Sequence, residues 1–448
     1  MATSLGGPGW RSLIQGAGLS LVLRLAGAGL GLAFNLLLAR TAGAEGTGLF
    51  FLAFSISGLV ALAARLGLDA IAMRQTAAGA AKAEWGEVAA DGRAALVIVA
   101  AMALLATLAL WLVAPLLADR LFAKPALVPV LQGLALTIAP MSLTTILAEL
   151  LRGLHSLLRS QALQALIAGA VALPFLALAG ARVDAEVAVW AQVAGNCVAC
   201  ALGALWWRQE INARLAVKSE SDSWTAVSAA ARCMPLLRAG GPLFWFSMLN
   251  ALMGTFDVLM LGAMGTVRDV GIYGTAVRFA SLTSFLLLAA NSFSGPHYAA
   301  AYAKGETAQL EILAVRSARL TTLAASPLLV LFLAFPSSCL ELFGKDFSAG
   351  WAVLLILSFG RFINLVTGSA GQVLIMTGCE RDVRNLSIIC AIITVGTSYF
   401  FITSFGAIGA AASTAISGIF LNVAATLFVF KRLGIWVHAF SSIRRGAT

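Results

Sequence analysis

The chain has 448 residues, of which 60% are hydrophobic and only 11% are charged, and its mean hydropathy is +0.92. Soluble domains carry about 25% charged residues, so this composition excludes a soluble globular protein. The net charge of +10 does not indicate a nucleic-acid partner, because membrane proteins concentrate Lys and Arg in their cytoplasmic loops. The apolar runs are continuous and lack the alternation of membrane β-strands, so they predict an all-α integral membrane protein.

Apolar runs recur along the whole chain, and crossing a bilayer takes about 20 residues. The first run follows a short Gly-rich N-terminus and is too long for the apolar region of a cleaved signal peptide, so we expect it to remain as a helix. Pro129 and Pro140 fall inside the fourth run, where a membrane helix absorbs them as kinks. The sequence predicts about twelve spans of this length. In chain order they cover 17–39, 49–68, 94–117, 126–150, 160–180, 185–207, 239–263, 271–294, 317–338, 350–376, 385–403 and 407–430.

The distribution of Lys and Arg between the predicted loops indicates how the chain is oriented. Most of these residues fall on the side that carries both termini. The exceptions on the opposite side are Arg40, Arg120, Lys124, Arg182, Arg268 and Lys345. Because cytoplasmic loops are the ones enriched in Lys and Arg, this bias predicts that both termini are cytoplasmic and that the number of spans is even.

The longest polar stretch runs from 208 to 238 and divides the predicted helices six and six. It could be an amphipathic helix on the inner leaflet, but a connector between two halves is the simpler interpretation. The sequence therefore predicts an N-terminal six-helix lobe over 1–208, a cytoplasmic linker over 209–238 and a C-terminal six-helix lobe over 239–448.

The two halves share landmarks, which indicates a duplication. Gly48 begins a Gly-Leu-Phe segment and Gly271 a Gly-Ile-Tyr segment at a similar place in each half. Repeats with an even number of helices insert the same way up and are related by an axis along the membrane normal. For such transporters the cargo site is expected where the repeats meet, with alternating access by rocking of the lobes.

Four charged residues lie inside predicted spans, namely Arg24, Asp257, Arg278 and Arg361. A charge at the centre of a membrane helix costs about 2.5–3.5 kcal/mol on insertion scales, so these side chains should face protein or water. Arginine presents a planar fork that matches phosphate oxygens, so Arg24, Arg278 and Arg361 are candidates for binding an anionic lipid headgroup. Asp257 and Arg278 flank a short turn; they could form a structural ion pair, or Asp257 could act as a gate or proton site.

The sequence offers no candidate catalytic or metal site. His155, His297 and His438 are not grouped with acidic residues at a catalytic or zinc-binding spacing. Cys197 and Cys200 match a CxxC pattern, but they lie in a predicted membrane helix, where two small packing residues are the better interpretation. There is no P-loop. We therefore expect a protein that is not an enzyme and needs no cofactor or metal.

Several segments of the chain resemble those of a known protein family. The motifs of the chain follow, in order, those of the lipid-linked oligosaccharide (O-antigen-type) flippases. These flippases form the polysaccharide-transport branch of the multidrug/oligosaccharidyl-lipid/polysaccharide (MOP) exporter superfamily. The resemblance rests on the segments 39–48, 66–74, 257–262, 270–273, 342–347 and 374–378.

The resemblance implies two six-helix bundles in a V, as in the MATE multidrug transporters, around a central cationic cavity. It implies alternating access that flips a polyprenyl-pyrophosphate-linked oligosaccharide across the bacterial inner membrane. Arg24, Arg278 and Arg361 would bind the substrate, and Asp257 would gate or couple to an ion. The implied partners are the lipid-linked oligosaccharide, membrane lipids, a polysaccharide polymerase and glycosyltransferases, and no nucleic acid.

Two other functions stay open at this stage. A cation-coupled multidrug antiporter of the MATE type would favour acidic groups in its cavity, whereas here the buried arginines outnumber the buried aspartate. A non-transporting membrane scaffold of a polysaccharide-synthesis complex would tolerate replacement of those arginines.

Overall fold

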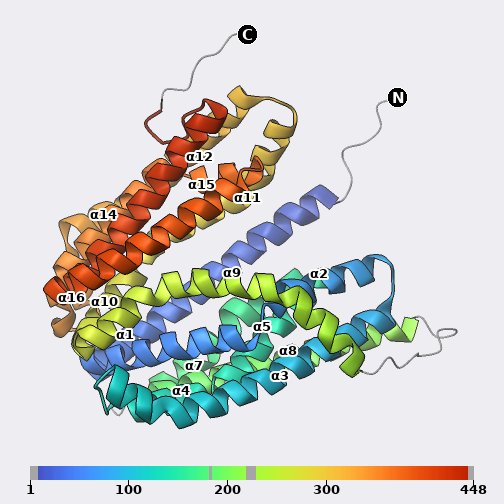
Figure 1. The fold of residues 1–448 in the computed structure, drawn as a ribbon, viewed down its shortest axis with the longest axis horizontal. Coiled ribbons are helices and arrows are strands. Elements are labelled where there is room, and N and C mark those ends of the chain that lie inside the picture. The colour runs from blue at the N-terminus through green and yellow to red at the C-terminus, as the bar shows by residue number, and fades with distance from the viewer. Residues whose placement is uncertain (1–8, 181–183, 218–228, 442–448) are drawn as a thin grey trace. The chain divides into compact units, whose positions relative to one another are not determined.

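The computed structural model describes residues 9–180, 184–217 and 229–441. Within these ranges the chain forms helices joined by short turns and no strands (Figure 1), which confirms the all-α prediction. The helices up to the middle of the chain are α1 (Gly9–Ala64), α2 (Leu68–Ala81), α3 (Trp85–Leu116), α4 (Leu127–Ala135), α5 (Ile138–Gly153), α6 (Leu157–Gln161), α7 (Ile167–Ala179), α8 (Ala185–Val217) and α9 (Ala229–Met264). They are followed by α10 (Val267–Ala280), α11 (Ser284–Ala303), α12 (Thr307–Ala334), α13 (Pro336–Glu341), α14 (Trp351–Thr367), α15 (Ala370–Met376) and α16 (Glu380–Leu433).

In the described chain, 9 helices are long and apolar enough to cross a membrane, so this is a multi-pass membrane protein. Two of them are long enough for two predicted spans each: Val22–Ala64 overlaps 17–39 and 49–68, and Arg381–Leu433 contains 385–403 and 407–430. Each is bent at one glycine, Gly43 (φ 67°) in α1 and Gly406 (φ 55°) in α16. Only glycine adopts such positive φ angles without a steric penalty, so both bends depend on it. The predicted segment 271–294 is helical but is not among the nine, so the number of twelve spans stays a prediction.

The chain divides into two compact units. The first consists of residues 1–42 and 49–255, and the second of residues 43–48 and 256–448. The boundary between the units falls inside α9, between Thr255 and Phe256, and the linker expected over 209–238 stays a prediction. Near the start of α9 a Cβ atom on Gly240 would lie 2.5 Å from the carbonyl oxygen of Leu66, so this part of the helix packs closely within the first unit.

The core of the first unit lies between α2, α3, α5 and α8 and is built from Leu, Ile, Val and Ala side chains. The indole of Trp207 on α8 fills the space above Gly92 on α3, where an added Cβ would approach the ring to 2.6 Å. Since lipid chains are as apolar as leucine, close van der Waals packing of this kind is what holds membrane helices together.

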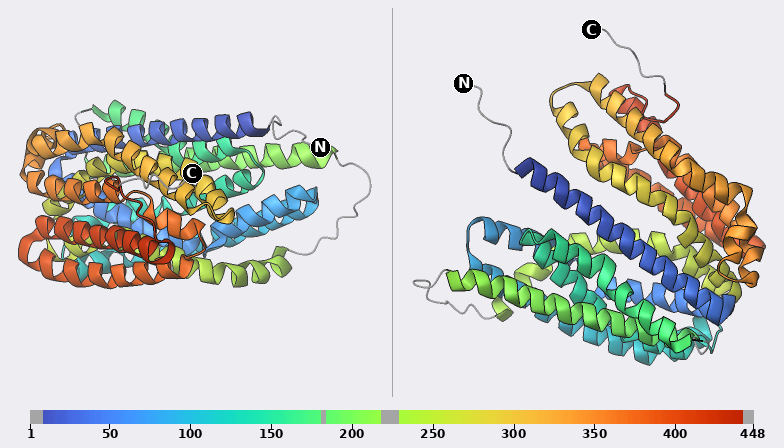
Figure 2. Two further views of the ribbon diagram at one scale, coloured as in Figure 1. Left: turned by 90° about the horizontal axis from the view of Figure 1, so that it is seen from above. Right: turned by 180° about the vertical axis from the view of Figure 1, so that it is seen from behind.

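The second unit has its own core between α11, α12, α15 and α16. The two arms of α16 run side by side as a hairpin (Figures 1 and 2), with Ser398 on the first arm bonded to Ser413 on the second. The segment after α16 turns back along the unit. It is held there by Arg319, which donates to the backbone carbonyls of Ala439 (2.9 Å) and Ser441 (2.7 Å).

The glycines that mark the sequence repeat touch each other in the second unit. A Cβ atom on Gly48 would lie 1.9 Å from the carbonyl of Val267, and one on Gly271 would lie 2.0 Å from the carbonyl of Ala44. Both glycines are therefore required for the helix backbones to approach this closely, as small residues are at many membrane helix contacts.

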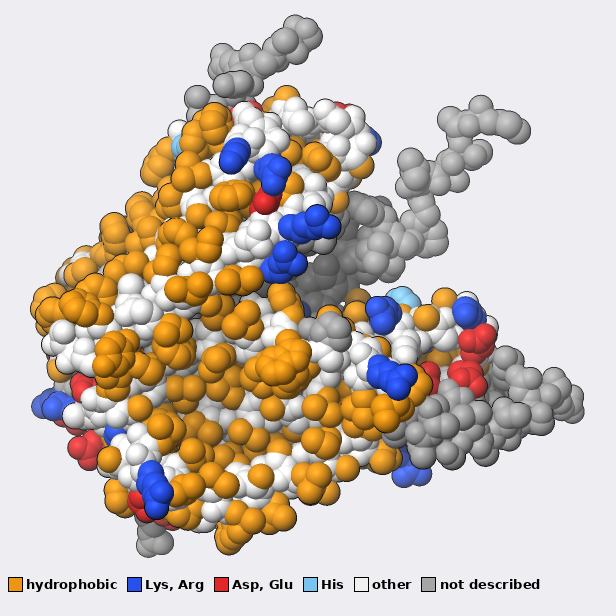
Figure 3. All heavy atoms as spheres, in the orientation of Figure 1, with side chains coloured by type: hydrophobic (Ala, Val, Ile, Leu, Met, Phe, Trp, Pro, Cys, Tyr) orange, Lys and Arg blue, Asp and Glu red, His pale blue; other side chains and the backbone are white. Residues whose placement is uncertain are grey.

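Large apolar side chains are exposed along the outer helices. On α3, Leu104, Leu108 and Leu112 follow one another at four-residue spacing and are each more than half exposed. Figure 3 shows hydrophobic side chains covering much of the face in view, with Lys and Arg in a few separate places. Such a surface would be unstable in water and suits contact with lipid.

Candidate functional site

Arg24 lies on α1, and its contact is a neutral one. Its Nε donates a 2.9 Å hydrogen bond to Oε1 of Gln161. Gln161 is the last residue of α6 and is only 5% exposed. The residues that follow, Ala162–Leu166, form a turn of π-helix. Such insertions occur often at functional sites. Arg24 could be identified as a candidate from the sequence, but Gln161, whose amide accepts its hydrogen bond, could not.

Asp257 lies on α9 and is 7% exposed. Its Oδ1 accepts a 2.5 Å bond from the hydroxyl of Ser398, and its Oδ2 accepts a 2.5 Å bond from the hydroxyl of Thr414. The Tyr273 hydroxyl lies 3.5 Å from Oδ2 and 2.7 Å from the Thr414 hydroxyl. Asp257 thus joins α9 to α10 and to both arms of α16 through hydroxyl groups.

The hydroxyl contacts continue between the two arms of α16. The Ser413 hydroxyl lies 2.8 Å from those of both Ser398 and Thr397. One turn further on, the hydroxyl of Thr394 donates a 2.9 Å bond to that of Ser417. Small hydroxyl residues of this kind let two membrane helices approach closely and bond across their interface.

The remaining two predicted arginines lie on neighbouring helices of the second unit. Nη1 of Arg278 donates a 3.2 Å bond to the backbone carbonyl of Gly274, one turn earlier on α10. Nη2 of Arg361, on α14, donates a 3.4 Å bond to the hydroxyl of Ser281. The structure gives Asp257 hydroxyl partners instead of the Arg278 partner that the short turn between them suggested.

Several charges at helix ends, by contrast, are paired with opposite charges. Arg65 lies 3.5 Å from Asp69, and Arg152 lies 3.1 Å from Glu149, so each of these arginines has an acidic partner. Glu210, which sequence reasoning did not select, bridges two further arginines. Its carboxylate accepts hydrogen bonds from Arg159 (2.9 Å) and from the Ser156 hydroxyl (2.8 Å), and it forms an ion pair with Arg214 (3.1 Å).

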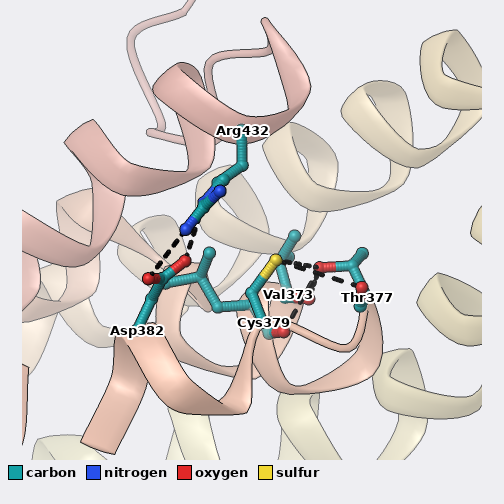
Figure 4. A network of polar contacts seen from close by, with 6 residues as sticks. Val373, Thr377, Cys379, Asp382 and Arg432 are labelled. Carbon is teal, nitrogen blue, oxygen red and sulfur yellow. Dashed lines mark hydrogen bonds and ion pairs between the residues drawn. The ribbon is translucent and has the colours of Figure 1, made fainter. Parts of the chain in front are cut away.

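Figure 4 shows the corresponding contact at the ends of α16. The guanidinium of Arg432, near the end of the second arm, donates to both oxygens of Asp382, at the start of the first arm, at 2.8 and 3.0 Å. Beside it the Thr377 hydroxyl donates to the Val373 carbonyl and contacts the Cys379 sulfur. The bidentate pair closes the open end of the hairpin.

Ionisable groups inside the spans of a helical membrane protein commonly mark a path for a substrate or an ion. Solved structures share the fold. An inward-facing multidrug resistance MATE family transporter of the MOP superfamily superposes with a TM-score of 0.70 at 16% identity, over 93% of this chain and 98% of that one. The lipid II flippase MurJ, in an inward closed conformation, gives a TM-score of 0.70 at 12% identity, over 92% of this chain and 87% of that one.

The family follows from the sequence match. Residues 13–294, well over half of the chain, match the family described as polysaccharide biosynthesis protein, and the chain belongs to that family. A curated relative is the probable low-salt glycan biosynthesis flippase Agl15 of Haloferax volcanii, which is 27% identical over 180 residues. The match spans 38% of this chain and 38% of that relative, so the chain covers about two fifths of the relative's length.

Proposed function

We propose that this protein is a flippase that moves a polyprenyl-pyrophosphate-linked oligosaccharide across the bacterial inner membrane, with both termini in the cytoplasm. Membership of the polysaccharide biosynthesis family and the similarity to a probable glycan flippase support a glycan-lipid cargo. The single observation that carries the proposal is the way Arg24 and Arg361 are held. Among the described residues both contact neutral groups, Gln161 and Ser281, so their positive charge is not cancelled.

The chemistry of a pyrophosphate headgroup fits these arginines. Guanidinium groups make strong, often bidentate hydrogen bonds to phosphate oxygens. Arg24, Arg278 and Arg361 would replace part of the hydration that the headgroup loses inside the membrane. The predicted cationic cavity follows from this role and is part of the proposal.

The membrane potential can supply free energy for this step. Moving one elementary charge through 100 mV is worth about 2.3 kcal/mol. A negatively charged headgroup that leaves a negative cytoplasm moves with this field. We expect that dissipating the potential in right-side-out vesicles slows flipping, and an unchanged rate would contradict the electrophoretic contribution.

Asp257 is proposed to couple transport to an ion. Its carboxylate is buried among hydroxyl groups of Tyr273, Ser398 and Thr414, which can serve either as donors or as acceptors. Uptake of a proton by the carboxylate would turn it from an acceptor of these bonds into a donor of one. That change would reorganise the contacts between α9, α10 and α16.

The test is a flipping assay with the purified full chain in liposomes. The probe is a farnesyl-pyrophosphate-linked disaccharide, and flipping is measured by its hydrolysis with a pyrophosphatase added outside. We expect Arg24→Ala and Arg361→Ala to lower the rate about tenfold or more, as is usual when a charge-assisted contact is lost. Arg432→Ala, at an ion pair outside the proposed path, is the matched control.

Three results would contradict the proposal. Wild-type rates in both Arg24→Ala and Arg361→Ala would show that these arginines are not needed for flipping. Absence of flipping by the wild-type chain would favour the non-transporting scaffold. Absence of flipping together with extrusion of cationic dyes would favour the multidrug antiporter.

A further inference from the structure

The contact between Arg24 and Gln161 joins a charged side chain to a neutral one, unlike the ion pairs of the same unit. The arginine donates from Nε to an amide oxygen at 2.9 Å. Elsewhere in the unit, arginines at helix ends form ion pairs with the carboxylates of Glu149 and Glu210. A carboxylate would hold the guanidinium equally well, and it would also cancel its charge.

The amide leaves most of the guanidinium available. Arginine carries five N–H groups, and only Nε–H is used in the bond to Gln161. Among the described residues, neither Nη1 nor Nη2 of Arg24 has a hydrogen-bond partner. The edge formed by these two nitrogens is the one that binds two oxygens of a phosphate at once.

The helices around the pair fix its geometry. One turn beyond Arg24, a Cβ atom on Gly27 would lie 2.0 Å from the carbonyl oxygen of Ala165, and further on Gly169 lies against Leu30. This close approach of α1 to the helix that carries Gln161 keeps the amide within reach of Arg24. The π-helical turn over 162–166 begins directly after Gln161.

We infer that Gln161 is a positioning residue for the proposed transport reaction: it orients the Arg24 guanidinium while leaving its charge free to bind an anionic headgroup. This inference rests on the proposed function. It assigns to Gln161 two requirements, a hydrogen-bond acceptor and a neutral side chain. A purely structural role would need only the first.

The two requirements are separated by two substitutions. Gln161→Leu removes the acceptor, and Gln161→Glu keeps the acceptor and adds a negative charge. Gln164→Leu is the matched control, since Gln164 lies on the same turn but bonds to Glu149 and Arg152. Binding of farnesyl pyrophosphate and of uncharged farnesol is measured on the full chain in phosphatidylcholine nanodiscs.

We expect the wild type and Gln164→Leu to prefer farnesyl pyrophosphate over farnesol. Gln161→Leu should weaken binding of the pyrophosphate about tenfold, and Gln161→Glu should weaken it at least as much, with farnesol binding unchanged. In the flipping assay both variants should raise KM more than they lower kcat. Because Gln161→Glu preserves the hydrogen bond and nearly the size of the side chain, it keeps the test valid if Gln161→Leu fails to fold.

Gln161→Glu that binds farnesyl pyrophosphate like the wild type would overturn this inference and leave Gln161 a structural residue. Unchanged binding of farnesyl pyrophosphate by the Gln161→Leu variant would also overturn it. A wild-type chain that binds farnesol as tightly as farnesyl pyrophosphate would overturn the proposed anionic substrate, and this inference with it.

Discussion

The charged residues within the spans differ from those at the helix ends in the partners they have. Arg24, Asp257 and Arg361 contact amide and hydroxyl groups among the described residues. The ends of the helices hold ion pairs instead, such as those of Asp382 with Arg432 and of Glu149 with Arg152. A neutral partner satisfies hydrogen bonds without removing the charge, so these three side chains keep a charge that a ligand or an ion can use.

The strongest test of this difference is the same substitution at two aspartates. Asp257→Asn keeps the size of the side chain and one acceptor oxygen, but it replaces the other oxygen with an NH2 donor and can neither ionise nor take up a proton. We expect it to lower the rate of flipping by about tenfold or more, as a loss of charge at a coupling site should. Asp382→Asn removes an exposed ion pair and should leave the rate unchanged. Equal flipping rates in Asp257→Asn and Asp382→Asn would contradict the proposed difference between charges within the spans and charges at the helix ends.

A second pair of variants tests the arginines. Arg361→Gln removes a charge held only by the Ser281 hydroxyl among the described residues, whereas Arg432→Gln removes a charge paired with Asp382. We expect Arg361→Gln to raise KM for the pyrophosphate-linked probe about tenfold and Arg432→Gln to leave it unchanged. An increase in KM in both variants would point to an effect of net charge on the whole protein.

Glu210 should affect stability and not transport. Its carboxylate joins Arg159 and Arg214, and all three side chains are partly exposed. Glu210→Gln leaves the two guanidiniums close together without their shared acid, which should cost about 1 kcal/mol after solvent screening. Thermal unfolding followed by tryptophan fluorescence should show a Tm lower by about one degree, since the unfolding entropy of a chain this long is large. A lower flipping rate per folded molecule would place Glu210 in the transport path.

The smallest expected effect concerns Asp69, which is paired with Arg65 at the start of α2. Burial raises the pKa of the Asp69 carboxyl, and the opposing influence of Arg65 is smaller. A group whose pKa is raised on folding contributes stability below its unfolded pKa and loses it as the pH rises through the folded pKa. Tm should therefore rise slightly as the pH falls from 6 to 4 by this contribution, and Asp69→Asn should remove it. If the difference in Tm between the wild type and Asp69→Asn did not change with pH, the predicted gain of stability at low pH would be wrong.

Much of the fold follows from hydropathy alone. The apolar runs predicted helices over most of the chain because the bilayer admits only segments whose backbone bonds are satisfied internally. The sequence could not show that α1 and α16 continue through Gly43 and Gly406, because the φ angle of a glycine cannot be deduced from the residues around it. It also could not place the division of the units inside α9, which depends on the contacts that the helix makes along its length.

The candidate site could be predicted only in part. Charged residues stand out in apolar runs, and for this reason Arg24, Asp257 and Arg361 were selected. Their partners did not stand out, because Gln161 and Ser398 are ordinary residues in membrane helices and come from segments more than 130 positions away. Pairing over such distances is a property of tertiary packing.

The single-glycine bends in α1 and α16 have a practical consequence for mapping the topology of this protein. At Gly43 and Gly406 the chain reverses with no loop between the two arms, and Phe34 on one arm of α1 meets Phe50 on the other with ring centroids 5.7 Å apart. Reporter insertions there would disrupt the hairpin they are meant to report on, so sidedness is better read from the longer connections.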